Sequence, residues 1–240
     1  MKNNKKSWEA SYSRKENFIY FPKEEIIKFL NRFIKKKISL DKYRQILKSN
    51  KKLRALDFGC GIGRSTILLK EFDIDGYGID ISENAIQESK KLSKHLGFNK
   101  TNFFQVFNGE KVQFKDNFFD FTISDCVLDS MSFDLAKQVI KEIDRVTKKY
   151  FFLSLISENS NSLFKNIKNK NLFDGEIEIT EQHEKGTIQS FFSIKKINYL
   201  IMDTNFKIIS CEHITTENII NNKKMGRYYL VLEKVKLWES

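Results

Sequence analysis

Residues 53–66 read LRALDFGCGIGRST, an apolar run that leads into three alternating glycines. The pattern predicts a buried strand over Leu53–Phe58 and a helix over Arg64–Glu71, with the glycines in the turn between them. Alternating glycines let the backbone bend sharply and let a ligand approach without obstruction by a Cβ atom. A strand, turn and helix of this kind indicate a nucleotide-type ligand at the carboxyl end of the strand.

The spacing of the glycines is not that of a dinucleotide site. The fingerprint G-x-G-x-x-G would need a glycine at position 64, where the chain has Arg64. Asp57 stands directly before the turn, and a carboxylate there is unsuited to a pyrophosphate. It suits a cationic ligand such as a sulfonium amino acid.

Two further elements follow in order. Asp80 closes the next predicted strand, and an acid about 20 residues after a glycine turn can accept hydrogen bonds from ribose hydroxyls. Asn108 and Gly109 follow the third predicted strand, and Asp125 follows the fourth.

Strands and helices alternate over most of the chain, which indicates a doubly wound α/β sheet with helices on both faces. The other predicted strands are Asp75–Ile79, Phe103–Phe107, Phe119–Ser124, Tyr150–Ser157, Phe206–His213 and Arg227–Lys236. Helices are predicted over Ser82–Leu96, with Ser82 as N-cap and Gly97 as C-cap, over Phe133–Thr147 and over Lys195–Met202. Upstream, Pro22 opens a predicted helix through Phe33, and a second short helix is predicted over Asp41–Lys48. Residues 158–190 are predicted to be irregular.

The order DFGCGIGRST, GIDIS and FNGEKVQFKDNFFDFTISD resembles class I S-adenosylmethionine (SAM)-dependent methyltransferases of the small-molecule type, over about residues 50–157. The resemblance implies a Rossmann-like sheet of seven strands, mostly parallel with the last antiparallel. SAM is the implied cofactor, with S-adenosyl-L-homocysteine as product. The implied cofactor-binding residues are Asp57, Gly59, Cys60, Gly61 and Gly63 for the methionine part, Asp80 and Ile81 for the ribose, Asn108 and Gly109 for the adenine, and in addition Asp125 and Tyr12. The family usually has Asp at position 108, and Asn can still accept a hydrogen bond there.

The N-terminal 50 residues are predicted to form a helical lid, and residues 51–240 the methyltransferase domain with a substrate cover at about 158–192. Trp8, Tyr12, Tyr20 and Phe21 precede the fold among polar residues. In similar enzymes such a segment folds over the donor site. The alternative is a helix that only packs on the sheet.

A hydroxyl acceptor needs a base, because a protonated alcohol is a weak nucleophile. His183 is the preferred candidate, and the alternative is a solvated loop histidine. Asp125 and Asp129 are further catalytic candidates, although Asp125 could equally be a capping residue. Gln189, Tyr20 and Arg227 are the candidate substrate residues. No carboxylates stand at a metal-ligand spacing, so a metal-independent enzyme is predicted.

The formal charge is +11, and lysines occur along the whole chain. We interpret them as a solvated surface, which makes a nucleic-acid partner unlikely. Cys60, Cys126 and Cys211 show no zinc or disulfide spacing, which favours the reduced cytoplasm. No apolar run approaches the roughly 20 residues of a membrane span.

The favoured function is methyl transfer to a hydroxyl of a small polar acceptor, such as a sugar, a sugar nucleotide or a phosphorylated metabolite. A weaker resemblance around residues 181–192, to methyltransferases of bacterial surface-glycan gene clusters, implies surface polysaccharide biosynthesis. The alternatives are an RNA or protein methyltransferase and a non-catalytic SAM-binding scaffold. Against the first, no N-P-P-Y-type motif follows the fourth strand.

Overall fold

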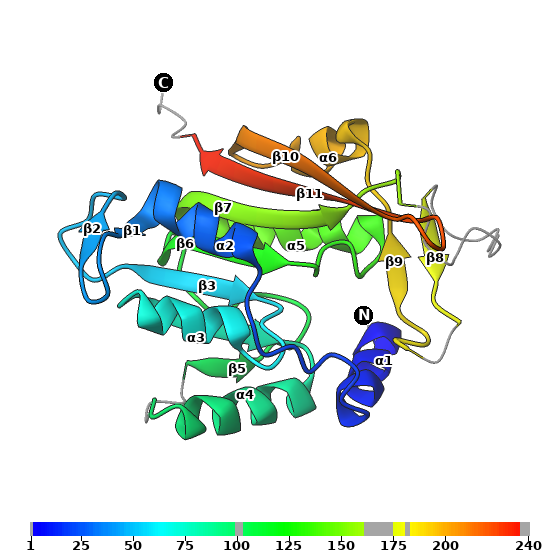
Figure 1. The fold of residues 1–240 in the computed structure, drawn as a ribbon, viewed down its shortest axis with the longest axis horizontal. Coiled ribbons are helices and arrows are strands. Elements are labelled where there is room, and N and C mark those ends of the chain that lie inside the picture. The colour runs from blue at the N-terminus through cyan, green and yellow to red at the C-terminus, as the bar shows by residue number, and fades with distance from the viewer. Residues whose placement is uncertain (1, 99–102, 161–174, 181–182, 236–240) are drawn as a thin grey trace.

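The structure is a computed structural model that describes residues 2–98, 103–160, 175–180 and 183–235 (Figure 1). Its helices are α1 (Lys2–Ser13), α2 (Glu24–Phe29), which a π-helical turn extends over Leu30–Ile34, α3 (Arg64–Glu71), α4 (Glu83–His95), α5 (Phe133–Val146) and α6 (Ile194–Ile201). Its strands are β1 (Lys35–Lys37), β2 (Tyr43–Gln45), β3 (Arg54–Phe58), β4 (Asp75–Asp80), β5 (Phe104–Val106), β6 (Phe119–Asp125), β7 (Thr147–Ile156), β8 (Glu176–Glu178), β9 (Ile188–Ser190), β10 (Phe206–Asn218) and β11 (Lys223–Lys234).

Seven strands form the main sheet in the order β10-β11-β7-β6-β3-β4-β5. The pairs from β7 to β5 are parallel, and β11 runs antiparallel to both β7 and β10. The predicted Rossmann-like sheet is therefore confirmed. The chain leaves β3 toward β4 on one side and later returns with β6 on the other, and this reversal opens a crevice at the carboxyl ends of the strands.

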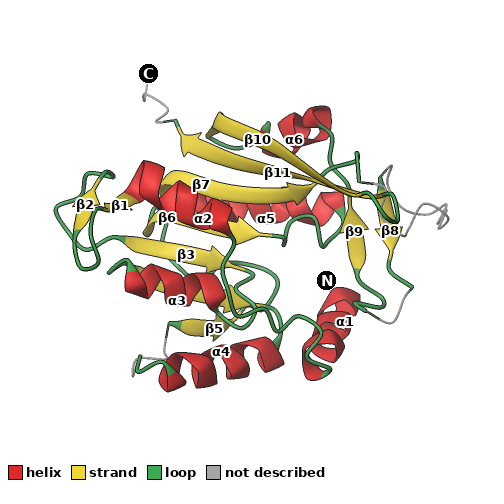
Figure 2. Ribbon diagram, in the orientation of Figure 1, coloured by secondary structure: helices red, strands yellow, loops and turns green. Residues whose placement is uncertain are grey.

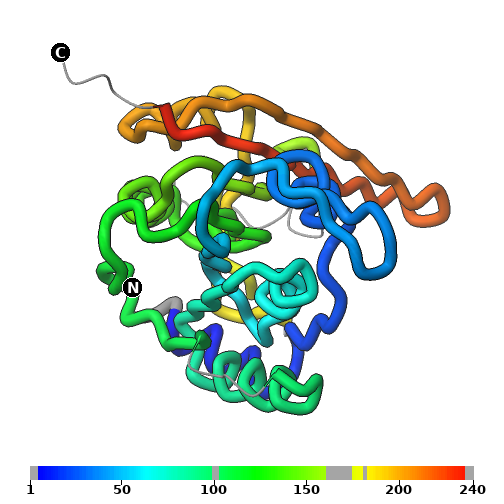
Figure 3. The backbone as a smooth tube through the Cα atoms, turned by 90° about the vertical axis from the view of Figure 1, so that its left-hand side faces the viewer, coloured from blue at the N-terminus to red at the C-terminus, as the bar shows by residue number. Residues whose placement is uncertain are grey.

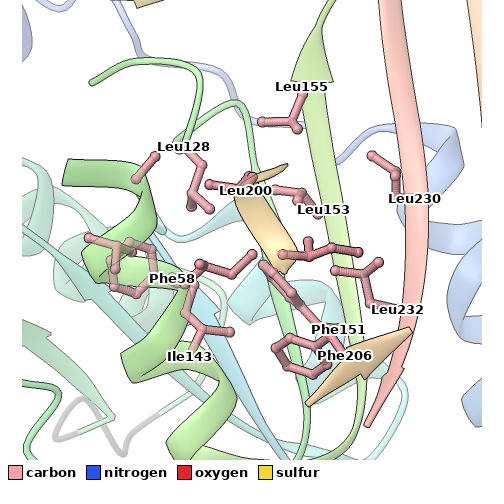
Figure 4. Packing of buried hydrophobic residues seen from close by; sticks show 14 of the residues in the cluster. Phe58, Leu128, Ile143, Phe151, Leu153, Leu155, Leu200, Phe206, Leu230 and Leu232 are labelled. Carbon is pink, nitrogen blue, oxygen red and sulfur yellow. The ribbon is translucent and has the colours of Figure 1, made fainter. Parts of the chain in front are cut away.

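Apolar side chains cover both faces of the sheet, because successive residues of a strand point to opposite faces. In β7, Phe151, Leu153 and Leu155 belong to the core beneath α5 and α6, whereas Phe152 belongs to the core beneath α2 and α3. Figure 2 shows α2 and α5 on opposite sides of the sheet, and Figure 4 shows the first of these cores. Burial on both faces explains why the strands are so rich in Phe, Leu and Ile.

The predicted N-cap of α4 is confirmed, whereas the C-cap is Leu96 and not Gly97, which is the next residue. The Ser82 hydroxyl accepts a hydrogen bond from the Ala85 amide, as an N-cap does, and Gly97 has a φ of +79° just beyond the helix.

The helix predicted over Asp41–Lys48 is wrong, because this segment holds β2, which pairs antiparallel with β1. The Tyr43 ring packs on Phe72, and the amides of Ile46 and Leu47 both donate to the Ile34 carbonyl. These tertiary contacts hold the backbone extended and outweigh local helix propensity. The irregular structure predicted over residues 158–190 is also wrong in part, since β8 and β9 form a hairpin there. Residues 161–174, 181, 182 and 236 lie outside the described residues.

Candidate functional site

The glycine turn is anchored on the neighbouring strand. The amides of Gly59 and Cys60 both donate to the Ile79 carbonyl, at 2.8 and 3.0 Å. Gly59 and Gly61 have φ values of +72° and +53°, in the left-handed region that favours glycine. A Cβ atom on Gly59 would lie 2.4 Å from a methyl carbon of Val127, and one on Gly61 would lie 2.6 Å from the Tyr12 hydroxyl. Val127 and Tyr12 therefore leave no room for side chains at these two positions, and the bare backbone of the turn lines the space beside them.

That space is a pocket of about 440 Å³, a volume typical of small-ligand sites. Its wall combines the glycine turn with α1, α5, the carboxyl ends of β3, β4 and β6, and the side chains of Lys23, His183, Glu184, Gln189 and Arg227. Of the residues predicted for the site, those that line it are Tyr12, Gly59, Cys60, Gly61, Asp80, Ile81, Gly109, Asp125, His183, Gln189 and Arg227. Figure 1 shows α1 and the β8–β9 hairpin facing the carboxyl ends of the parallel strands.

Two buried acids lie at the glycine turn. Asp57 is outside the pocket lining, below the turn, and one of its oxygens accepts a 2.7 Å hydrogen bond from the Thr66 hydroxyl. Asp80 lines the pocket, and its two oxygens accept from the amides of Gly61 and Ser82, at 2.8 and 2.9 Å. Burial raises the pKa of each carboxyl to about 6. Both acids are therefore held in an environment that a bound cation would stabilise.

Four other predicted residues lie outside the pocket lining, Asp129 among them. Gly63 is packed against Phe104. The Asn108 side-chain oxygen accepts a hydrogen bond from the Glu110 amide, so it serves the local turn. Tyr20 is 53% exposed at the surface.

Helix α1 covers one side of the pocket. Tyr12 is buried, and burial raises the pKa of its hydroxyl well above the usual value. Glu9 accepts hydrogen bonds from the Ser82 hydroxyl and from the amides of Glu83 and Asn84. A carboxylate on these amides is favourable, because they form the positive end of the α4 dipole. Helix α1 is thereby fastened beside Asp80.

The opposite wall is charged. Asp125 accepts hydrogen bonds from Lys23, Arg64 and Ser154, at 2.9, 2.8 and 2.6 Å. Burial alone would raise the pKa of this carboxyl, but the two cations outweigh it and hold the pKa below its usual value. An acid that is held ionised and engaged on both oxygens is suited to positioning its neighbours and poorly suited to taking up a proton.

Asp129 forms a buried ion pair with Arg227. One carboxylate oxygen lies 2.7 Å from an Arg227 guanidinium nitrogen and also accepts from the Ile156 amide. The Asp129 backbone carbonyl accepts from the Gln189 side chain at 2.6 Å. Asp129 is outside the pocket lining, whereas Arg227 and Gln189 line it, so Asp129 holds both of them in place.

His183 is exposed, with its ring nitrogen 3.4 Å from the Glu16 carbonyl oxygen. Its neighbour Glu184 is half-buried and also lines the pocket. Glu184 has a φ of +59°, a strained conformation for a residue other than glycine, and its amide donates to the Glu16 carboxylate. Burial raises the pKa of the Glu184 carboxyl, although His183 partly offsets this effect. The turn thus brings two candidate bases to one pocket.

Sequence reasoning missed Lys23, Arg64 and Glu184. A signal for Arg64 existed, because an arginine in the first turn of a helix opposes the helix dipole and therefore needs another partner. Lys23 lies 102 residues from Asp125, and no local pattern links the two. Glu184 directly follows His183, and histidine is the commoner general base.

Within the described residues, no group of three or more His, Cys, Asp or Glu side chains could hold a metal ion. In the same part of the chain, no helix is long and apolar enough to cross a membrane.

Comparisons with known proteins agree with this geometry. A family model described as a methyltransferase domain matches residues 49–225. An uncharacterized protein of Haemophilus influenzae is 29% identical over 96 residues, which are 40% of this chain and 38% of that protein. The chain thus matches well under half of that relative's length.

Solved structures share the fold. A SAM-dependent methyltransferase of Methanosarcina mazei superposes with a TM-score of 0.62 at 23% identity, over 78% of this chain and 94% of that one. A SAM-dependent methyltransferase of Anabaena variabilis superposes with a TM-score of 0.63 at 16% identity, over 96% of this chain and 95% of that one. The magnesium protoporphyrin IX methyltransferase of Synechocystis with bound SAH superposes with a TM-score of 0.56 at 19% identity, over 77% of this chain and 75% of that one.

The family model spans most of the chain, and it includes the glycine turn, Asp80 and Asp125. The chain therefore belongs to the methyltransferase-domain family, whose methyl donor is S-adenosyl-L-methionine.

Proposed function

We propose that this protein transfers a methyl group from SAM to a hydroxyl of a small polar acceptor. The observation that carries the proposal is the continuity of one pocket from Gly61 and Asp80 to Arg227, Glu184 and Gln189. SAM bound beside Gly61 and Asp80 would direct its methyl group toward the polar side chains of Arg227, Glu184 and Gln189. The enzyme's main tasks would then be to align the two reactants and to exclude water.

The residues present fit the donor. Gly59 and Gly61 bring the bare backbone of the turn to the pocket wall, where the methionine part of the donor would lie with the Asp57 carboxylate below, and Asp80 keeps lone pairs for ribose hydroxyls. Gly109 and Asn108 remain the proposed adenine contacts, and Gly109 lines the pocket together with the apolar side chains of Phe107 and Val139. When bound, SAM supplies a methyl group on a positively charged sulfur, which is already an activated donor.

We further propose that residues 1–21 act as a lid over the donor. Deleting them should weaken SAM binding several-fold, because Tyr12 and Trp8 would no longer cover the pocket and Glu9 would leave the α4 amides. Calorimetric titration with SAM measures the change. Lys5→Gln, which removes an exposed ion pair with Glu83, is the control and should leave the affinity unchanged. Equal affinity in the deletion variant would favour the simple packing role.

His183 is proposed as the base that takes the acceptor proton, and the Glu184 carboxylate would stabilise the imidazolium beside it. His183→Ala should lower kcat by about a hundredfold, since general bases contribute on that order, while the SAM dissociation constant stays unchanged. Glu184→Gln should have a smaller effect.

Near-normal turnover of His183→Ala would contradict that assignment. If Glu184→Gln instead abolishes transfer, Glu184 is the base, and the activity of the unaltered enzyme should fall as the pH drops through the raised pKa of Glu184. SAM binding in both variants separates loss of chemistry from loss of the fold.

The acceptor is proposed to carry an anionic group, as a sugar nucleotide or a phosphorylated sugar of surface polysaccharide synthesis does. Arg227 supports this, because only one of its three guanidinium nitrogens has hydrogen-bond partners among the described residues and the side chain lines the pocket. Gln189 and Tyr20 are the other proposed substrate contacts, Gln189 within the pocket lining and Tyr20 outside it.

A panel of sugars, sugar nucleotides and sugar phosphates, assayed with radiolabelled SAM, tests the acceptor class. Transfer to RNA or protein alone would overturn it. SAM binding without product from any acceptor would favour a scaffold role.

A further inference from the structure

The net charge of this protein is concentrated in one short segment. Residues 35–52, here called the basic hairpin, contain eight Lys or Arg residues and one Asp, a net charge of +7 out of +11 for the whole chain. The segment consists of β1, β2 and the flanking residues. Lysines occur along the whole chain, but the excess of positive over negative charge is concentrated in this segment and is not evenly distributed.

Most of these cations have no acidic partner. Lys35 and Lys52 reach Asp73, at 3.5 and 2.7 Å, and Lys52 also reaches Asp75. The other six are exposed and form no ion pair within the described part of the chain: Lys36, Lys37, Lys42, Arg44, Lys48 and Lys51. These six side chains are therefore available to bind an anionic partner.

The pairing of the strands adds repulsion. Lys36 lies directly opposite Arg44 in the antiparallel register, and like charges in such a pair destabilise a hairpin. The hairpin keeps its shape because the Ile34 carbonyl binds two amides of the returning strand and Tyr43 packs on Phe72. An external anion would relieve this repulsion. The contacts of Ile34 and Tyr43 that hold the hairpin do not involve the side chains of Lys36 or Arg44.

The tip of the hairpin is apolar. Ile38 and Leu40, in the turn between β1 and β2, are 57% and 92% exposed. A projecting leucine at the tip of a lysine-rich hairpin fits the boundary of a lipid bilayer, where the apolar side chain enters below the headgroups and the cations stay at the phosphates. Single-stranded nucleic acid is bound differently, by open aromatic rings that stack on bases. The one aromatic ring of the hairpin, Tyr43, is covered by Phe72, Lys35 and Lys37.

We propose that the basic hairpin docks this protein onto an anionic lipid surface. The hairpin lies at the amino end of β3, at the opposite edge of the sheet from the pocket, as the positions of β1 and α1 in Figure 1 show. Figure 3 views the molecule from the hairpin end. Docking through this end would leave the pocket facing away from the membrane and open to acceptors in solution. The inference is therefore independent of the proposed acceptor.

Co-sedimentation of the full chain with vesicles tests the proposal. Vesicles of phosphatidylglycerol and phosphatidylcholine in equal parts should bind the protein, and pure phosphatidylcholine vesicles should not. Lys36→Gln/Lys37→Gln/Arg44→Gln should weaken binding roughly a hundredfold, since each cation near an anionic surface contributes roughly fivefold. Leu40→Ser keeps every charge and should weaken binding roughly tenfold through lost apolar insertion.

The matched control is Lys90→Gln/Lys94→Gln/Lys195→Gln, which removes the same charge from exposed lysines outside the hairpin. It should change vesicle binding little. SAM titration of every variant should match the unaltered protein, which verifies the fold and keeps this test separate from that of methyl transfer.

Three results would overturn the proposal. They are absence of binding to the anionic vesicles, an equal loss in the control variant, and normal vesicle binding by Leu40→Ser together with tighter binding of polyuridine. The last result would make the hairpin a site for nucleic acid.

Discussion

Gly61→Ala is expected to weaken SAM binding by about a hundredfold in a protein that still folds. Gly61 has a φ of +53°, which costs a residue with a Cβ atom about 1–2 kcal/mol. The added Cβ would also lie 2.6 Å from the Tyr12 hydroxyl, on the face of the turn that lines the pocket. Either the turn or α1 must move, and each movement disturbs the donor end of the pocket. Titration calorimetry with SAM measures the loss.

Gly97→Ala is a matched control for this variant. Gly97 also has a left-handed φ, +79°, but nothing lies within 4 Å of a Cβ atom placed there. It should reduce the free energy of unfolding by about 1 kcal/mol, as strain alone does, and leave SAM affinity intact.

A double variant separates the two causes of the loss at Gly61. Tyr12→Phe removes the clashing oxygen, so Gly61→Ala/Tyr12→Phe should recover part of the affinity if displacement of α1 is the cause. Normal SAM affinity in Gly61→Ala alone would contradict the assignment of the turn to the donor.

Arg227→Met is expected to lower the free energy of unfolding by about 3 kcal/mol, because it leaves the Asp129 carboxylate buried without its partner. Asp129 is 1% exposed, and its second oxygen already has no hydrogen-bond partner among the residues that the structure describes. Urea unfolding followed by circular dichroism measures the change. The same variant should lose methyl transfer if Arg227 binds the acceptor, with SAM affinity retained.

The double variant Arg227→Met/Asp129→Asn should recover much of the lost stability, since the unpaired charge is gone. Lys148→Met, which removes a more exposed pair with Asp120, is the control and should cost less than about 1 kcal/mol. Unchanged stability of Arg227→Met would show that the Asp129 pair does not stabilise the fold.

The sequence was most informative where function and local structure coincide. The glycine turn between β3 and α3, the strand-ending Asp80 and the Ser82 cap of α4 each depend on a few adjacent residues, and the structure has all three elements as predicted. The fold class followed from the alternation of strands and helices for the same reason.

The errors lie where distant contacts decide local structure. Residues 41–48 hold the strand β2 and no helix, because Tyr43 and Leu47 pack on the body of the fold. The β8–β9 hairpin brings Glu184 to the pocket, and only the folded chain puts that residue opposite the glycine turn.

The sequence by itself determined the Rossmann-like sheet and the donor-binding turn, because strand periodicity and glycine backbone freedom are properties of short segments. Only the tertiary structure decided the other half of the site. Lys23, Arg64 and Asp125 come from three separate segments, and Asp129 meets Arg227 across 98 residues of chain. Ion pairs at such separations follow from the strand order, which brings β6 and β11 to either side of β7.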